Sequence, residues 1–155
     1  MKSKHRLLAR ALGLSASIIL FQAGVPAIAG DVEKAVEYRQ GVMEVFSWNM
    51  KAMGAMMKGK MAYDQKQFAE HAADLATASK LNLMGGFPED SESEESDAMA
   101  EIWMDFEDFT SKYRDMGIAT KALNEAAQGG DKSKMGMALK EVGKSCKACH
   151  KKYKN

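Results

Sequence analysis

Two cysteines and a histidine near the end of the chain are the residues best suited to chemistry. They form the segment Cys146-Lys147-Ala148-Cys149-His150. Cys-x-x-Cys-His is the attachment motif for c-type haem. Two thiols about one helical turn apart can each add to a haem vinyl group, and the adjacent imidazole can then bind the iron. The motif therefore predicts one covalently attached haem c.

Three other uses of these residues fit the sequence less well. A thioredoxin-like redox pair needs a strand-to-helix context, which is missing around the motif. A disulfide between Cys146 and Cys149 would close a tiny loop and add little stability. A zinc site needs two further ligands, but His71 is the only other histidine after the first 29 residues. These comparisons favour haem.

Residues 1–29 have the pattern of a secretory signal peptide. Residues 1–10 contain four basic side chains and no acidic one, residues 11–29 contain no charge, and the stretch closes on Ala27-Ile28-Ala29. A basic start, an apolar run and a small-x-small ending are typical of a cleaved leader. An uncleaved membrane anchor is the alternative, but glycines, serines and a proline dilute the apolar run. We expect cleavage after Ala29, a mature domain of residues 30–155, and the periplasm of a Gram-negative bacterium as its location.

Removal of the leader changes the charge of the protein. The whole chain has 22 Lys+Arg and 21 Asp+Glu, and four of the basic residues lie in the leader, which leaves 18 against 21 and a net charge of −3. This balance excludes a nucleic-acid binder. No further apolar stretch approaches membrane-spanning length, so we expect no membrane attachment after cleavage. The mild acidity indicates a basic or electrostatically indifferent redox partner.

Apolar residues at helical spacing predict four amphipathic helices, over residues 31–58, 65–82, 98–128 and 132–153. Asp64 and Asp131 are candidate N-caps. Residues 83–97, which contain glycines, a proline and an acidic run, are predicted to form a solvated loop. Four such helices with short first and third connections make an all-α, antiparallel four-helix bundle. The predicted buried stripes comprise Val36, Met43, Phe46, Met50, Met53 and Met57; Phe68, Ala72, Leu75 and Ser79; Ile102, Phe106, Phe109, Tyr113, Met116, Thr120 and Leu123; and Met135, Leu139, Val142, Cys146, Cys149 and Tyr153.

Arg39 interrupts the stripe of the first helix, since it stands where the heptad of Phe46 and Met53 predicts an apolar residue. A charge buried on that face needs an anionic partner. Haem propionates would supply one; alternatively, the side chain extends out of the bundle end to water. Met43 lies one turn further along the same face. It has three possible roles: iron ligand through its thioether, wall of the distal side of the haem, or core packing residue.

The remaining conspicuous residues have structural interpretations. Trp48 and Trp103 are expected to be packing residues, and His71 is expected to be solvated or to cap a helix. Met56 and Met61 are candidates for an exposed contact between two subunits; ordinary packing or solvent exposure is the alternative. The sequence contains no Ser-His pair, phosphate loop or paired-carboxylate motif, so we expect no enzyme turnover.

Four segments carry a resemblance to a known family. Tyr-Arg-Gln-Gly-Val-Met (38–43), Met-Lys-Gly-Lys-Met-Ala-Tyr-Asp (57–64), Glu-Ile-Trp (101–103) and Val-Gly-Lys-Ser-Cys-Lys-Ala-Cys-His (142–150) resemble cytochrome c′, of the class II c-type cytochromes. The likeness covers essentially the whole mature chain, in order. It implies a left-handed antiparallel four-helix bundle with covalent haem near one end, often as a homodimer.

The resemblance also implies roles for individual residues. Cys146 and Cys149 would form the thioethers, and His150 would be the proximal iron ligand. Arg39 and Gln40 match a pair that contacts the haem propionates in relatives. The segment before Glu-Ile-Trp lies beside the haem in that family, but it lacks here the proline that relatives often have, so we assign it no contacts.

The position of Met43 leaves two functions open. In cytochromes c′ the matching residue is bulky and does not ligate, and the iron is five-coordinate and high-spin. Such a protein would bind small gases, nitric oxide and carbon monoxide among them, and exchange electrons with redox partner proteins. In the low-spin branch of class II a methionine at this place ligates the iron. Met43 and His150 would then give a six-coordinate pure electron carrier.

Overall fold

The computed structural model describes residues 29–155, so the predicted leader lies outside the described residues apart from Ala29. Within this range no helix combines the length and the hydropathy that crossing a bilayer demands. The same range contains no β-strand, only an isolated bridge between Ala98 and Lys154. The helices are α1 (Ala29–Met57), α2 (Gln65–Ala78), the 3-10 helix η1 (Leu83–Gly86), α3 (Glu101–Met104), α4 (Phe106–Gln128) and α5 (Lys132–Tyr153).

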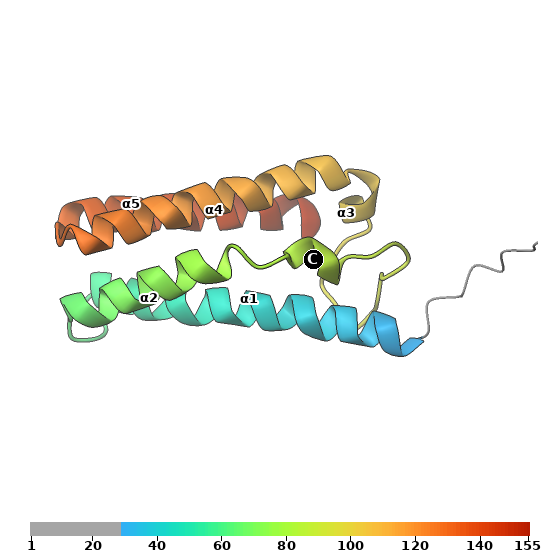
Figure 1. Ribbon diagram of the computed structural model, residues 1–155, viewed down its shortest axis with the longest axis horizontal. Coiled ribbons are helices and arrows are strands. Elements are labelled where there is room, and N and C mark those ends of the chain that lie inside the picture. Colours follow the sequence, from blue (N-terminus) through green and yellow to red (C-terminus); the bar gives the residue numbers. More distant parts are fainter. Residues whose placement is uncertain (1–28) are drawn as a thin grey trace, which may run out of the picture.

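The four long helices form the predicted antiparallel bundle. Figure 1 shows α1 and α2 in one layer and α4 and α5 in the other, with each helix running opposite to the one before it. The turns α1–α2 and α4–α5 lie at one end. At the other end, where α1 begins and α5 finishes, η1, α3 and the C-terminus gather. The all-α prediction is confirmed.

The predicted helix boundaries follow local side-chain chemistry. The Asp64 carboxylate accepts a hydrogen bond of 3.0 Å from the backbone N–H of Gln67, which caps α2. Asp131 accepts from two backbone N–H groups in the first turn of α5, at 2.9 and 3.1 Å. Such caps satisfy donors that have no partner inside the helix. Gly59 and Gly130 have φ angles of 67° and 72°, a left-handed conformation that suits glycine after a helix.

The prediction of one continuous helix over residues 98–128 was wrong, because the chain breaks at Asp105. This residue has φ −138° and ψ 58°, outside the helical region. Its carboxylate caps α4 by accepting from the N–H of Asp108 at 3.4 Å, and it binds Lys152 Nζ at 2.8 Å. An aspartate that bonds to nearby backbone competes with helix continuation. Here a lysine from α5 adds a distant partner.

The second helix is also shorter than predicted, since α2 ends at Ala78 and not near Asn82. The hydroxyl of Tyr113 donates to the carbonyl of Leu81 at 3.0 Å, and that of Tyr38 donates to the carbonyl of Asn82 at 3.1 Å. After Ala78 the backbone N–H groups of Lys80 and Leu81 bond to the carbonyls three residues back, at 3.1 and 3.0 Å, so the last turn tightens and the α-helix ends. The loop predicted for residues 83–97 therefore begins with the short helix η1.

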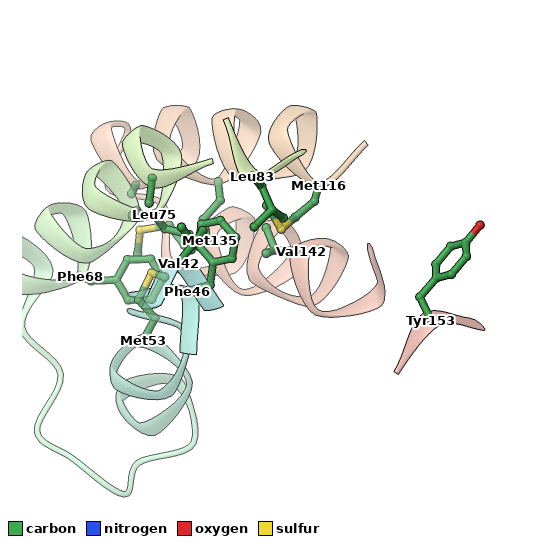
Figure 2. Packing of buried hydrophobic residues seen from close by; sticks show 14 of the residues in the cluster. Val42, Phe46, Met53, Phe68, Leu75, Leu83, Met116, Met135, Val142 and Tyr153 are labelled. Carbon is green, nitrogen blue, oxygen red and sulfur yellow. The ribbon is translucent and has the colours of Figure 1, made fainter. Parts of the chain in front are cut away.

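The core lies between the two layers and contains most of the predicted stripe residues. In Figure 2, the side chains of Val42, Phe46 and Met53 from α1 gather against Phe68 and Leu75 from α2. Two positions differ from the prediction. Phe106 is exposed beside the break at Asp105. Met56 is only 2% exposed, so it is a packing residue and not part of a contact between subunits, whereas Met61 is exposed.

Candidate haem site

A cavity of about 710 Å³ lies between the middle of α1, residues 39–50, and the last turns of α5. Its size falls within the range of small-molecule and cofactor pockets. Its walls come from α1, α4, α5 and the loop before α3, with apolar side chains predominating. Every site residue assigned from the sequence lines this one cavity: Arg39, Gln40, Met43, Cys146, Cys149 and His150.

The Cys-x-x-Cys-His segment occupies the last turns of α5. Cys146 and Cys149 are half-buried free thiols that pack against the core. Burial raises the pKa of both thiols, which keeps them protonated. Desolvation lowers the pKa of His150, and the charge of Lys154 adds to this effect. A neutral imidazole is the form that binds a metal.

Arg39 is buried, with 2% of its surface exposed, so the alternative in which its side chain extends to water was wrong. One terminal nitrogen donates to the carbonyl of Gly86 at 3.1 Å and to Ser91 Oγ at 3.2 Å. The other donates to the carbonyl of Ser91 at 3.0 Å. The guanidinium also lies over Phe87 and Trp103, at 4.9 and 5.7 Å from their ring centroids. Arg39 therefore holds the loop after η1 against α1.

The charge of Arg39 is not compensated within residues 29–155. No carboxylate there lies within 4 Å of it, and its Nε has no hydrogen-bond partner. Desolvation accordingly lowers the pKa of Arg39. A buried cation with an unpaired N–H at the wall of a cavity fits a ligand that carries carboxylates. Haem propionates have this chemistry.

The acidic loop is fixed to the cavity rather than simply solvated. Gln40 Nε2 donates to the carbonyl of Glu95 at 2.8 Å, and Lys154 Nζ lies 2.6 Å from Asp97 Oδ2. As a result Glu95, Ser96, Asp97 and Ala98 border the cavity. The prediction that the charges of this loop are solvated holds for Glu95 and Asp97, whose side chains are exposed, but the composition of the loop did not reveal its attachment. No contacts were predicted for residues 97–100, because the proline of relatives is missing there.

Apolar side chains predominate in the part of the cavity around Met43, although Gln40, Glu44 and Ser47 of the same helix also line it. Met43 is half-buried on α1, and Phe46 and Met50 from the same helix line the cavity with it. Leu83 and Met116 close this region from the 3-10 helix and from α4. A ligand bound near Met43 would therefore meet thioether and hydrocarbon surfaces, which offer few hydrogen bonds.

A polar network fixes the end of α5 that carries the motif. Tyr153 donates to Asp108 Oδ2 at 2.6 Å, and Lys152 Nζ binds Asp105 at 2.8 Å and Asp108 at 2.9 Å. The hydrogen bond from Tyr153, followed by that from Lys152, lowers the pKa of Asp108 to about 2. The network joins the last turn of α5 to the start of α4. It thereby limits movement of His150 relative to the bundle.

Three residues with predicted structural roles lie outside the cavity. Trp48 is 72% exposed, so its assignment as a packing residue was wrong. Trp103 is half-buried, and its indole donates to the carbonyl of Pro88 at 2.8 Å. His71 is only partly exposed, and its Nδ1 lies 2.9 Å from Asn49 Oδ1.

The family model for cytochrome c′ matches residues 34–154. The chain belongs to the cytochrome c′ family. Cytochromes c′ bind c-type haem, and the two half-buried free cysteines of this member are consistent with covalent attachment. Its cofactor is therefore haem c.

Named relatives support the assignment over the length of the domain. A cytochrome c′ from Rhodospirillum rubrum is 38% identical over 127 residues, covering 81% of this chain and 85% of that protein. The solved cytochrome c′ of Shewanella frigidimarina has a TM-score of 0.76 at 37% identity and covers 80% of this chain and 96% of its own. A variant of the Alcaligenes xylosoxidans cytochrome c′ was solved as a nitric oxide complex; its TM-score is 0.73 at 34% identity, with 80% and 95% covered.

Proposed function

We propose that this cytochrome c′ is a periplasmic protein that binds small gases, nitric oxide in particular, and exchanges electrons. The proposal rests on one observation: the Cys-x-x-Cys-His motif and the mainly apolar wall around Met43 line the same cavity. When bound, haem supplies an iron that takes up diatomic ligands and changes its oxidation state. The chain's residues hold the group and control access to it.

The motif residues of α5 would attach and orient the group. Each thiol, of Cys146 and of Cys149, would add across a vinyl double bond of the group. Sulfur would bond to one carbon and the thiol hydrogen would go to the other, so the addition would consume no oxidant. The neutral imidazole of His150 would supply a nitrogen ligand to the iron. On the opposite wall, Arg39 and Gln40 would pair with the propionates.

The apolar wall favours uncharged ligands. Small gases need no hydrogen-bond donor in order to enter, whereas charged or strongly polar ligands lose their hydration in such a pocket. A relative's structure as a nitric oxide complex supports the choice of gas. We expect the reduced protein to bind about one nitric oxide per chain in an optical titration. A spectrum that nitric oxide leaves unchanged would contradict gas binding.

The alternative function is a low-spin electron carrier in which Met43 and His150 both ligate the iron. Met43→Leu separates the two, since leucine keeps the bulk but cannot bind a metal. We propose the five-coordinate state, and therefore expect this variant to keep the wild-type absorption spectrum. Met50→Leu, in the same helix and cavity, is the matched control. The alternative would be established if the wild type and Met50→Leu have low-spin spectra and Met43→Leu has a high-spin spectrum.

The leader pattern supports export to the periplasm. Cleavage after Ala29 would give a mature chain that begins at Gly30. N-terminal sequencing of the protein isolated from a periplasmic extract tests this directly. A chain that retains residues 1–29 would instead support the membrane anchor.

We further propose a homodimer that forms through the exposed face of α1 and α2. Val45, Trp48 and Leu81 are large exposed apolar residues, and all three line one shallow groove between these helices. Exposed tryptophans in such patches are frequent centres of protein interfaces. This surface replaces the contact through Met56, which is buried.

Trp48→Asp should therefore weaken dimerisation. Loss of a central tryptophan typically costs about 2 kcal/mol or more, which corresponds to a roughly 30-fold weaker association. Sedimentation equilibrium of the haem-loaded protein measures this change. Met104→Asp is the control, since Met104 is 81% exposed but lies on α3 at the cavity end. An equal effect of both variants, or a monomeric wild type, would contradict the proposed interface.

A further inference from the structure

The outer face of α5 carries a concentration of positive charge that the proposed function does not explain. Residues 140–155 contain six lysines and a single acidic residue, Glu141. In contrast, residues 89–97 contain six acidic residues and no basic one, and this loop is bound to α1 through Arg39 and Gln40. Two of the six lysines, Lys152 and Lys154, are paired with carboxylates of Asp105, Asp108 and Asp97, so the other four supply the positive charge of the outer face. The net charge of −3 therefore does not describe the surface that a partner would meet at α5.

Four of these lysines form one stripe. Lys140, Lys144, Lys147 and Lys151 follow one another at intervals of four, three and four residues, and all are exposed. Residues at these intervals lie on one face of a helix. The buried residues of α5, Val142 and Tyr153 among them, occupy the opposite face. We call these four residues the lysine stripe.

Most of the lysine stripe has no acidic neighbour. Lys144 lies 2.7 Å from Glu141, but among residues 29–155 no carboxylate lies within 4 Å of Lys140, Lys147 or Lys151. Two other helices differ: α2 pairs Lys66 with Glu70, and α4 pairs Lys121 with Glu125, each four residues apart. In α5 the residue four positions after Lys140 is another lysine, and the same holds for Lys147.

Helix stability accounts for only part of this arrangement. Cations near the C-terminal end of a helix interact favourably with its dipole, which explains Lys151. This effect is confined to the last turn, so it does not explain Lys140 or Lys144. Like charges four residues apart destabilise a helix. The lysine stripe therefore opposes folding locally, which indicates a use in binding.

The lysine stripe lies close to the proposed haem attachment points. Cys146 and Cys149 belong to the same helix and face the cavity. An α-helix with its side chains is about 10–12 Å across. A protein bound to the outer face of α5 would therefore lie about one helix diameter from the thioethers. Exposed charge of one sign increases the rate at which partners of opposite charge associate.

We propose that the lysine stripe of α5 is the docking surface for an acidic redox partner protein. This inference rests on the proposed function, since it presumes electron exchange at the cavity behind α5. It differs from the expectation of a basic or indifferent partner, which came from net charge alone. The lysine stripe would recognise a cluster of carboxylates on the partner, spaced to match ammonium groups along three turns of a helix.

The test uses the haem-loaded protein with a purified flavodoxin as an acidic redox protein. Stopped-flow absorbance follows reduction by the flavodoxin hydroquinone between about 0.01 and 0.3 M salt, a range over which screening removes most surface attraction. We expect the wild-type rate to fall about tenfold over this range. The triple variant Lys140→Gln, Lys144→Gln, Lys151→Gln should be about tenfold slower than wild type at low salt and nearly insensitive to salt.

The matched control is Lys58→Gln, Lys66→Gln, Lys121→Gln, which removes the same charge from α2, α4 and the segment after α1. We expect it to retain most of the wild-type rate and salt dependence. Equal behaviour of the two triple variants would overturn the proposal, as would a wild-type rate that rises with salt. Selective loss of binding to vesicles that contain phosphatidylserine, with flavodoxin kinetics unchanged, would also overturn it and assign the stripe to a membrane surface.

Two further measurements distinguish a failure of docking from a failure of the proposed function. Haem content and nitric oxide binding, measured on each variant before mixing, report on the function alone. Calorimetric titration with oxidised flavodoxin reports on docking without electron transfer. Binding that is lost only in the α5 variant supports the docking surface even if gas binding fails. Absence of binding by the wild type would overturn it even if haem is loaded.

Discussion

Replacing Cys146 and Cys149 together by serine should yield a chain that loses all of its haem on extraction with acidic acetone. Serine keeps the size and approximate polarity of the side chain, so the end of α5 should fold as before. A hydroxyl does not replace a thiol in the addition to a vinyl group. The mass of the denatured wild-type protein should exceed the mass of its polypeptide by one haem. The mass of the double variant should equal that of its polypeptide.

Ala148→Ser is the matched control, since Ala148 is exposed between the two cysteines and does not line the cavity. It should retain covalent haem in full. Each single cysteine variant should retain haem through the remaining thioether. Covalent haem in the double serine variant would contradict the attachment sites. A haem-free wild type with a Cys146–Cys149 disulfide or with bound zinc would support the alternatives set aside from the sequence.

Arg39→Met should cause the second large effect, a loss of stability in the haem-loaded protein. The substitution removes three hydrogen bonds to Gly86 and Ser91 and leaves their carbonyls buried. It also removes the cation that we pair with the propionates. Removing one partner of a buried charge pair costs about 3 kcal/mol or more. For a domain of this size that corresponds to a decrease in Tm of roughly 10 °C.

Arg114→Met is the control for Arg39→Met, because Arg114 is the only other arginine after the leader and is exposed on α4. Its Tm should stay within a few degrees of wild type. Arg39→Lys should be intermediate, since an ammonium group keeps the charge but cannot span both loop residues. Thermal unfolding followed by far-UV circular dichroism gives all three values. Equal Tm values for the two methionine variants would contradict the role of Arg39 in holding the loop and the propionates.

The bundle was predictable because its signals are local. Asp64 and Asp131 cap helices within their own first turns, and the apolar spacing on each helix depends only on that helix. The break at Asp105 was missed because part of its cause is distant: Lys152, which binds this carboxylate, lies 47 residues further along the chain. Helix patterns report which face is buried, but not which residue elsewhere will capture a side chain.

The candidate site was predictable to a similar degree. A motif within one helix identified Cys146, Cys149 and His150, and Arg39 was conspicuous because a charge interrupted an apolar stripe. Composition did not reveal that the loop around Glu95 is attached to the cavity wall, because that attachment is made through backbone carbonyls that every residue has. Net charge likewise did not reveal the lysine stripe, because it does not record where on the molecule the charged residues lie.

The absorption spectrum of the reduced protein before and after addition of carbon monoxide tests the central claim most directly. The claim is that α5 attaches a haem whose iron His150 binds on one side, with an apolar and unligated pocket beside Met43. It predicts a broad high-spin spectrum that changes to that of a carbon monoxide complex. A reduced spectrum that carbon monoxide leaves unchanged, together with a methionine-to-iron charge-transfer band near the red edge in the oxidised protein, would contradict it.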